Sequence, residues 1–418
     1  MSKLIIQGGK PLHGTIQCQG LKNAATPLIA STLLLDHPCT FSNVPRLVDV
    51  DSMIAIIGGI GGKGSFIGDH ELEIDTSSVN SCAPEKKLVA RLRSSVLFMG
   101  PLLARFGKVH MFEPGGCLIG SRSLSTHLDA FRQLGITIES EGDTIKLEKT
   151  RPLADEVTLS EFSVTATENC IMLCALESGR RTIFLSAVEP HIIDLVSFLN
   201  KCGAKMTWKD AHVLEIQGVS SLTPVPHRIV PDYVEAGTWA VAAAVTKGDI
   251  TITHVETRDM KLVIKKLVDM GLSVRDQGSS LSVTYTKPLS AFSIQTMPHP
   301  GFPTDLQAPF SVLASQAQGE STIHDPLFEG RLGYLQELEK MGLECKVLNP
   351  HQALVNGPTR LKGTEMSAPD LRAGATIILA GLCAEGETVI DHAEIIDRGY
   401  ERIEARVKDL GASLSRTE

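Results

Sequence analysis

Six cationic side chains occupy matching places along the chain and are its clearest candidates for chemistry. Three stand at the start of predicted apolar helices, and three stand in loops before a second helix. The first set is Lys22, Arg93 and Arg372, and the second set is Arg122, Arg331 and Arg398. A helix N-terminus attracts anions through its free N–H groups, and the planar guanidinium of arginine suits both phosphate and carboxylate. The six cations together indicate a polyanionic ligand, although each one alone is also compatible with a solvated surface charge.

Two further residues could react with such a ligand. Cys117 lies in "FEPGGCLIGSR", whose glycines predict a mobile or tightly turning loop. In an electropositive setting this thiol is a candidate nucleophile or proton donor, and burial as a structural cysteine is the alternative. Asp305, in "HPGFPTDLQAPF", opens a predicted helix. It either caps that helix or stays ionised among the cations and accepts a proton from a substrate hydroxyl.

A repeat of about 70 residues positions these side chains. Phrases such as "KCGAKMTW", "DMGLSVRD" and "KMGLECKV" recur with glycine in third place; the equivalent glycines are Gly61, Gly135, Gly203, Gly271, Gly342 and Gly411. Each unit reads as an apolar helix, a short β run, an amphipathic helix that ends at the glycine, and two β runs around a turn. This alternation predicts an α/β fold, in which the apolar helices are buried inside a ring of sheets.

The bulk composition bounds the organisation and the partners. A length of 418 residues fits two globules of three units better than six separate cores. The proline-containing stretch at residues 221–233 is the best candidate for the crossing between globules, and a cleft between them is the expected place for the cations. A net charge of −8 without a basic stripe argues against nucleic-acid binding. No run approaches the roughly 20 apolar residues of a membrane span.

The cysteines and histidines do not predict a metal site. The 9 cysteines form no CxxC pair and the 13 histidines show no HExxH spacing. Cys170 and Cys174 lie one turn apart on an apolar helix face, so we expect them in the core. Scattered cysteines in a large chain without a signal peptide favour a reducing, cytoplasmic location.

Several motifs resemble, nearly end to end and in the same order, the UDP-N-acetylglucosamine 1-carboxyvinyltransferase family of enolpyruvyl transferases. The motifs are "LKNAATPLIASTLL", "VPRLVDVDSM", "PGGCLIGSR", "HPGFPTDLQA", "DLRAGA" and "IDRGYERI". The resemblance implies a two-domain inside-out α/β barrel with six repeats, three in each domain. Residues 21–230 are then the first domain, which carries the cysteine loop, and residues 1–20 plus 231–418 the second.

The resemblance also implies a reaction. It is transfer of the enolpyruvyl group of phosphoenolpyruvate to the 3-hydroxyl of UDP-N-acetylglucosamine, with release of phosphate and without a cofactor, as the first committed step of peptidoglycan synthesis. Shikimate 3-phosphate ranks lower as the acceptor, because the sibling enzyme that uses it lacks the loop cysteine and the "FPTDLQ" phrase.

Individual roles follow from the resemblance, residue by residue. Lys22, Arg122 and Arg398 match positions on the phosphate side of phosphoenolpyruvate, and Arg331 and Arg372 match positions on its carboxylate. Positions that contact the UDP-sugar match Asn23, Arg93, Ser123, Leu124, Ser125, Thr126, His127, Ser163, Asp305 and Leu327. Lys22, Asp305 and Cys117 match catalytic positions. Asp305 corresponds to the group that receives the hydroxyl proton, and Cys117 corresponds to the loop cysteine that fosfomycin modifies.

Departures from the family pattern concentrate on the acceptor side. Residues 123–126 read Ser-Leu-Ser-Thr where the family usually has an aspartate that binds uracil, and Glu161 stands where some members have lysine. Tyr233 replaces a usual arginine, and Ile395 replaces a common histidine. Weakened nucleotide affinity and transfer to a different nucleotide or nucleotide sugar are both compatible with these changes.

Two functions of other classes are also compatible with the resemblance. A non-catalytic paralogue that binds a nucleotide is disfavoured by the retained Cys117, Asp305 and six cations. An RNA-directed enzyme of the related cyclase fold is disfavoured by the acidic charge balance.

Overall fold

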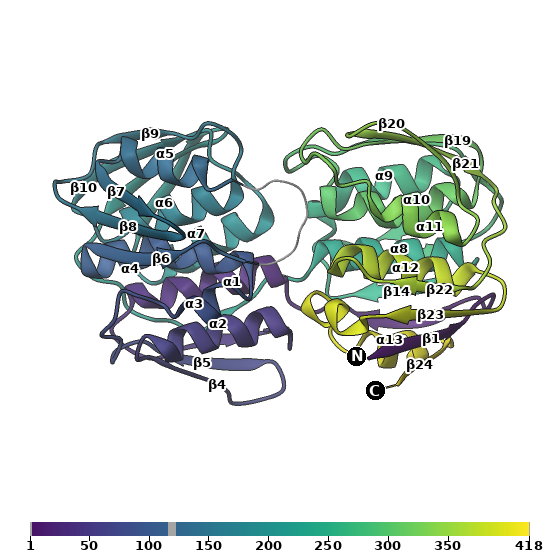
Figure 1. Cartoon of the computed structure of the whole chain (residues 1–418), viewed down its shortest axis with the longest axis horizontal. Helices are drawn as coiled ribbons and strands as arrows, with labels where there is room; N and C mark the ends of the chain where they lie inside the picture. The colour runs from purple at the N-terminus through teal and green to yellow at the C-terminus, as the bar shows by residue number, and fades with distance from the viewer. Residues whose placement is uncertain (1, 116–122, 418) are drawn as a thin grey trace. The chain divides into compact units, whose positions relative to one another are not determined.

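The computed structural model describes residues 2–115 and 123–417. These residues divide into two compact units (Figure 1). We call residues 20–115 with 123–230 the first unit, and residues 2–19 with 231–417 the second unit.

The described residues of the first unit form three sheets. Their strand orders are β13-β3-β5-β4, β6-β8-β7 and β11-β12-β10-β9. The strands are β3 (Cys39–Ser42), β4 (Lys63–Phe66), β5 (Glu71–Asp75), β6 (Lys108–Phe112), β7 (Ile136–Glu141), β8 (Thr144–Lys149), β9 (Glu156–Thr158), β10 (Gly179–Phe184), β11 (Lys205–Asp210), β12 (Val213–Gly218) and β13 (His227–Arg228). The helices are α1 (Lys22–Ser31), η1 (Thr32–Leu34), α2 (Val48–Gly59), α3 (Lys86–Val89), η2 (Arg93–Phe98), α4 (Met99–Phe106), α5 (Ser125–Gln133), α6 (Val164–Cys174) and α7 (Pro190–Lys201), where η marks a 3-10 helix.

The second unit also contains three sheets among its described residues. Their orders are β22-β23-β1-β24, β15-β16-β14-β2 and β17-β19-β21-β20, with β18 also paired to β19. The strands are β1 (Lys3–Gln7), β2 (His13–Gln17), β14 (Asp249–Thr253), β15 (Ser273–Asp276), β16 (Ser280–Thr284), β17 (Leu289–Ser290), β18 (Ser293–Gln295), β19 (Ala317–His324), β20 (Glu344–Asn349), β21 (Gln352–Gly357), β22 (Glu365–Ser367), β23 (Glu387–Asp391) and β24 (Ser413–Thr417). The helices are α8 (Tyr233–Val245), η3 (Thr257–Met260), α9 (Lys261–Asp269), η4 (Thr304–Leu306), α10 (Gln307–Ser315), α11 (Tyr334–Lys340), α12 (Leu371–Cys383), η5 (Ala393–Arg398) and α13 (Ile403–Asp409).

The apolar helices of the sequence are buried, as their all-round hydrophobicity predicts. In the second unit α8, α10 and α12 pack against one another, and each also contacts a sheet. Every residue of α8 and of α10 is buried. In the first unit α1, η2 with α4, and α6 hold the same positions, and Cys170 and Cys174 lie in the core of α6, as expected. In each unit these apolar helices are therefore buried and contact the sheets, whereas the second helix of a repeat, such as α9, keeps an exposed face.

The six recurring glycines have one conformation and one task. Their φ angles range from +93° at Gly135 to +108° at Gly203, which is a region that L side chains rarely adopt. Each follows the amphipathic helix of its repeat, so it ends that helix and turns the chain into the next strand. The repeated phrases in the sequence are explained by this turn.

The sequence pattern did not predict a set of short parallel strands. The strand after each of five buried helices pairs in parallel with a short strand. In three cases the short strand directly precedes that helix, namely β9 with β10, β17 and β18 with β19, and β22 with β23. In the other two cases, β3 after α1 pairs with β13, which precedes α8, and β14 after α8 pairs with β2, which precedes α1. These partners have only two to five residues, for example His227–Arg228 and Glu156–Thr158. Segments so short show no usable alternation, so periodicity could not find them.

Candidate functional site

Asp305 binds two arginines in the second unit. Its Oδ1 accepts a hydrogen bond from Nη2 of Arg331, and its Oδ2 lies 3.0 Å from Nη2 and 3.1 Å from Nε of Arg372. The two arginine side chains are each 7% exposed, whereas that of Asp305 is 23% exposed. These three residues, which we call the Asp305 cluster, were all predicted site residues, and the structure brings them together. Asp305 lies inside η4, and the N-cap positions of η4 and α10 are Pro303 and Leu306, so Asp305 does not occupy the helix-cap position that the alternative required.

A buried aspartate that the sequence reasoning missed holds the loop that carries Arg331. Asp325 is 0% exposed and accepts hydrogen bonds from the hydroxyls of Thr296 and Thr304 and, at 3.1 Å, from the backbone N–H of Leu327. Thr304 in turn accepts a hydrogen bond from Nη1 of Arg331. Asp325 thereby fixes the loop that contains Leu327 and also Thr304, the residue before Asp305. Leu327 itself is 39% exposed. Only its place directly after a strand marked it in the sequence.

Arg372 lies in a dense set of polar groups. Its Nη1 donates to the hydroxyl of Tyr400 at 3.3 Å, and its guanidinium carbon lies 5.6 Å from the centre of that ring. Burial alone would lower the pKa of Arg372, but Asp305, Tyr400 and Asp232 outweigh it and raise the pKa. Asp232 caps α8 through the N–H groups of Val234 and Glu235, and burial raises its pKa to about 6 against the opposing effect of Arg372. Arg372 therefore remains charged in a largely dry environment.

Arg398 ends η5, directly before Gly399, and is half-buried. Ile396 of the same 3-10 helix is buried against α12, because a Cβ added at Gly374 would lie 2.6 Å from its Cγ1. The segment with Arg398 therefore packs on the helix that begins with Leu371 and Arg372.

In the first unit the predicted cation Lys22 is buried in an ion pair. It is the first residue of α1, is 9% exposed, and its Nζ lies 3.1 Å from Oδ2 of Asp49 in the first turn of α2. Asp49 is 4% exposed and was not identified from the sequence. Asn23 follows on α1 and is half-buried. The ion pair holds the ammonium group at the N-terminus of a helix, where the free N–H groups add to its attraction for anions.

Several of the residues predicted to contact the UDP-sugar lie around α5 and α6 in the first unit. Nη2 of Arg93 donates to the carbonyl of Ser123 at 3.1 Å. Leu124, the residue before α5, is half-buried, and the backbone N–H of Ser125 donates to Oγ of Ser123 at 2.9 Å. The hydroxyl of Ser163 caps α6 by accepting from the N–H of Ala166. Arg93 and residues 123–125 are thus connected in the first unit.

Thr126 and His127 turn inward from α5. The Thr126 hydroxyl donates to Oε1 of Glu161 at 2.8 Å, and Nε2 of His127 lies 2.8 Å from Oγ1 of Thr165. Burial, with a smaller contribution from Arg93, lowers the pKa of His127 to about 3. His127 is therefore neutral at physiological pH, while Glu161 is exposed.

Two predicted site residues, Cys117 and Arg122, lie outside the described residues. Their proposed roles stay predictions.

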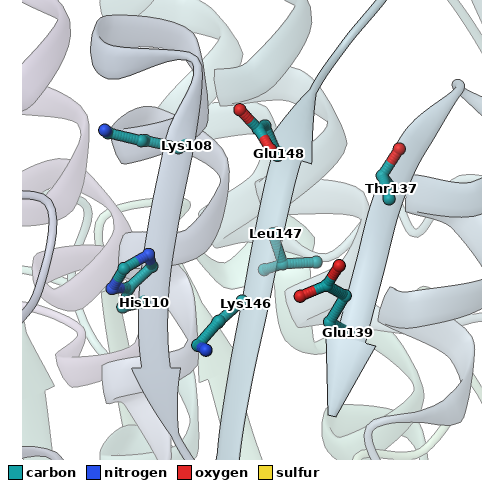
Figure 2. Close-up of a pocket in the computed structure, with 7 residues that line it drawn as sticks. All are labelled: Lys108, His110, Thr137, Glu139, Lys146, Leu147 and Glu148. Atoms are coloured by element: carbon teal, nitrogen blue, oxygen red, sulfur yellow. The ribbon is translucent and has the colours of Figure 1, made fainter.

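A shallow depression of about 210 Å³ lies on the sheet of β6, β8 and β7 and contains none of the predicted site residues (Figure 2). Its lining carries both charge signs, with Lys108, His110 and Lys146 beside Glu139 and Glu148. This mixture does not favour an anion.

Residues 2–115 and 123–417 contain neither a metal-binding cluster nor a helix that could span a membrane. No group of three or more His, Cys, Asp or Glu side chains is arranged there to hold a metal ion. No helix within the same residues combines the length and apolarity that crossing a bilayer requires.

Comparisons with known proteins give consistent family assignments. A profile of the EPSP synthase (3-phosphoshikimate 1-carboxyvinyltransferase) family matches residues 6–407. The chain is 38% identical over 418 residues to the UDP-N-acetylglucosamine 1-carboxyvinyltransferase of Pseudoalteromonas atlantica and 40% identical over 418 residues to that of Desulforapulum autotrophicum, covering 100% of each chain in both cases.

Solved structures show the same fold at lower identity. The enolpyruvyl transferase NikO from Streptomyces tendae has a TM-score of 0.89 at 24% identity, with 100% of this chain and 99% of that chain covered. EPSP synthase from Acinetobacter baumannii has a TM-score of 0.77 at 16% identity, with both chains fully covered. The family match and the full-length identity to curated relatives show that the chain belongs to the UDP-N-acetylglucosamine 1-carboxyvinyltransferases, within the EPSP synthase family of enolpyruvyl transferases.

Proposed function

We propose that this protein transfers the enolpyruvyl group of phosphoenolpyruvate to the 3-hydroxyl of UDP-N-acetylglucosamine and releases phosphate. The observation that carries the proposal is the Asp305 cluster in a chain about 40% identical, over its full length, to enzymes named for this activity. An ionised carboxylate beside two buried guanidinium groups supplies a base and an anion-binding pair in one place.

The fold description also belongs to this proposal. Each unit is taken as one domain of an inside-out α/β barrel with three repeats, and the domain boundaries are residues 21–230 and residues 1–20 plus 231–418. The buried apolar helices and the sheets that they contact support this description. Peptidoglycan synthesis, a cytoplasmic location, action without a cofactor and inactivation by fosfomycin at Cys117 are further parts of the proposal.

Arg331 and Arg372 are proposed to bind the carboxylate of phosphoenolpyruvate. In the structure their N–H donors are directed at Asp305. A substrate carboxylate carries the same charge and the same pair of acceptor oxygens, so it competes with Asp305 for these donors. Substrate binding therefore loosens the hold on Asp305 and frees its oxygens for the acceptor hydroxyl.

The reaction proceeds by addition and elimination. The sugar 3-hydroxyl oxygen bonds to C2 of phosphoenolpyruvate while Asp305 takes its proton and C3 gains a proton, for which Cys117 is the proposed donor. Loss of a C3 proton and of phosphate from the tetrahedral adduct then leaves the enol ether. Lys22, Arg122 and Arg398 are proposed to stabilise the charge of the departing phosphate.

A second candidate is the same transfer to a different nucleotide or nucleotide sugar. The hydrogen bond between Thr126 and Glu161 favours it, because it places a carboxylate next to the segment assigned to the uracil and diphosphate. A carboxylate repels a diphosphate but accepts hydrogen bonds from a base. Thr126 and Glu161 therefore affect recognition of the acceptor, not of phosphoenolpyruvate.

Phosphate release from phosphoenolpyruvate tests both candidates. Purified protein is offered UDP-N-acetylglucosamine, UMP and other UDP-sugars separately, and the product masses are recorded. Release with UDP-N-acetylglucosamine, with the mass of its enolpyruvyl ether, supports the first candidate. Release only with another acceptor supports the second, and no release with any of them contradicts the proposed function.

A further inference from the structure

Arg416 in the last described strand has an unusually complete set of partners. Its Nη1 and Nη2 donate to Oδ2 and Oδ1 of Asp397 at 3.0 and 2.7 Å, and its Nε and Nη2 donate to the two carboxylate oxygens of Glu404 at 3.1 and 3.2 Å. Nη1 also donates to Oγ of Ser2 at 3.3 Å. A guanidinium has five N–H donors, and here five hydrogen bonds are formed. The Arg416 side chain is 21% exposed, so solvent only partly screens these bonds.

Arg416 lies in β24, an edge strand of the sheet β22-β23-β1-β24. β24 pairs antiparallel with β1, with Leu4 opposite Arg416, and β1 pairs on its other side with β23. Figure 1 shows the purple β1 between the yellow β23 and β24. Ser2, just before β1, contributes as well, since its carbonyl accepts from the N–H of Ala393 and its hydroxyl donates to Glu394. The guanidinium therefore projects from a fixed strand.

The segment that Arg416 binds has little regular structure of its own. It consists of η5, a short link and the start of α13. The residues before η5 and before α13, His392 and Arg402, have φ angles of +58° and +44°. Such angles are unfavourable in residues other than glycine and persist only where the surroundings enforce them. Asp397 and Glu404, the two partners of Arg416, lie in η5 and in the first turn of α13.

The other side of this segment faces the Asp305 cluster. Ile396 packs beside Gly374 of α12, and the Tyr400 hydroxyl accepts the hydrogen bond from Arg372. Asp397 directly precedes Arg398. Arg416 thus fixes one side of a segment whose other side carries Arg398 and contacts Arg372.

We propose that Arg416 is a positioning residue that holds residues 393–404, and through them Arg398 and Tyr400, in the geometry that binds phosphoenolpyruvate. It acts through Asp397 and Glu404 and does not itself touch the substrate. The inference rests on the proposed function for its substrate, whereas its structural part stands on the contacts alone.

Steady-state kinetics and hydrogen exchange of three variants test the proposal. Arg416→Ala removes the five bonds, Arg416→Lys keeps the charge with fewer donors, and Arg360→Ala removes a matched arginine that pairs on the surface with Glu385 in the same unit. We expect Arg416→Ala to raise the KM for phosphoenolpyruvate about tenfold or more, with the KM for the acceptor changed less than about twofold. Arg416→Lys should recover part of the loss, and Arg360→Ala should behave as wild type.

Hydrogen exchange separates this proposal from the proposed function. In Arg416→Ala the amides of residues 393–404 should exchange at least about tenfold faster, while those of α8 and α10 stay protected. Unchanged exchange in residues 393–404 overturns the proposal even if the wild type is inactive, and an inactive wild type with faster exchange contradicts only the proposed function. Equal rises in both KM values, or a uniform loss of protection, indicate a general structural role and also overturn it.

Discussion

Replacing Asp305 by asparagine should affect both stability and turnover, by amounts that follow from its contacts. The carboxylate accepts bonds from Arg331 and from two nitrogens of Arg372. Asparagine has nearly the same volume but only one acceptor oxygen, and its NH₂ group faces a guanidinium donor. Breaking a buried ion pair costs about 3–5 kcal/mol, because it leaves a charge without a partner. Since the Asp305 side chain keeps 23% of its exposure, we expect a loss of about 2–3 kcal/mol in unfolding free energy.

Asp305→Asn should also lower the turnover number. An amide cannot take the hydroxyl proton, and a general base typically contributes 10²–10⁴-fold, so kcat should fall by at least about 100-fold. The affinity for phosphoenolpyruvate should stay close to that of wild type or increase, because the substrate carboxylate no longer competes with the Asp305 carboxylate for the two arginines.

Urea unfolding, phosphate release and calorimetric binding of phosphoenolpyruvate measure the three quantities for Asp305→Asn. The matched control is Asp269→Asn in the same unit, where an exposed carboxylate pairs with Lys265 one helical turn away and contributes only about 0.3–0.5 kcal/mol. A kcat within about threefold of wild type would remove Asp305 from the mechanism. An unfolding free energy equal to that of Asp269→Asn would refute the idea that the carboxylate holds the two arginines in solution.

Three further predictions concern the first unit and the cysteine loop. Asp49→Asn removes the ionic partner of the buried Lys22 ammonium, so it should lower the unfolding free energy by about 1–3 kcal/mol. It should also raise the KM for phosphoenolpyruvate, because Asp49 holds the ammonium group in place. A KM equal to that of wild type would contradict the proposed role of Lys22. Cys117→Asp should keep turnover yet abolish inactivation by fosfomycin, and unchanged inactivation, measured as residual activity against time, would point to another residue. Burial lowers the pKa of His127 from 6.5 to about 3. Below pH 6.5 the His127 side chain therefore becomes protonated in the unfolded chain but stays neutral in the folded chain. As the pH decreases below 6.5, the unfolding free energy of the wild type should fall by about 1.4 kcal/mol per pH unit more steeply than that of His127→Asn. Denaturation midpoints of the two proteins that change in parallel from pH 7 to 5 would contradict this prediction.

Local patterns in the sequence predicted the parts of the fold that depend on local physics. The turn glycines, such as Gly271, were found because a left-handed residue must follow each amphipathic helix. The hairpin of β15 and β16 was found because the turn at residues 277–279 interrupts two alternating runs. The burial of α8 follows from its lack of a polar face. Each of these features is determined within about 15 residues of chain.

The partners of the site residues could not be predicted in this way. Asp305 and Arg372 are 67 residues apart, and Arg416 and Ser2 are 414 apart. A hydrophobic period gives the face of a helix on which a residue lies but not which residue of another repeat opposes it. Asp49, Asp325 and Glu404 were missed for this reason, because each is an ordinary acidic residue near a helix or strand end until the fold brings its partner to it.

The acidic partners of these cations affect how a polyanionic substrate binds to this acidic chain. Lys22 pairs with Asp49, and Arg331 and Arg372 share Asp305, so much of the positive charge is compensated within its own unit. A ligand anion gains little from charge alone at such groups, because it must replace a carboxylate of equal charge. The advantage then goes to a ligand that carries two linked anionic groups, a carboxylate and a phosphate, since linked groups bind with a high effective concentration. Inorganic phosphate, which offers only one group, should therefore compete with phosphoenolpyruvate far more weakly than its charge suggests, and equal inhibition by phosphate and by a phosphoenolpyruvate analogue would show that net charge governs binding.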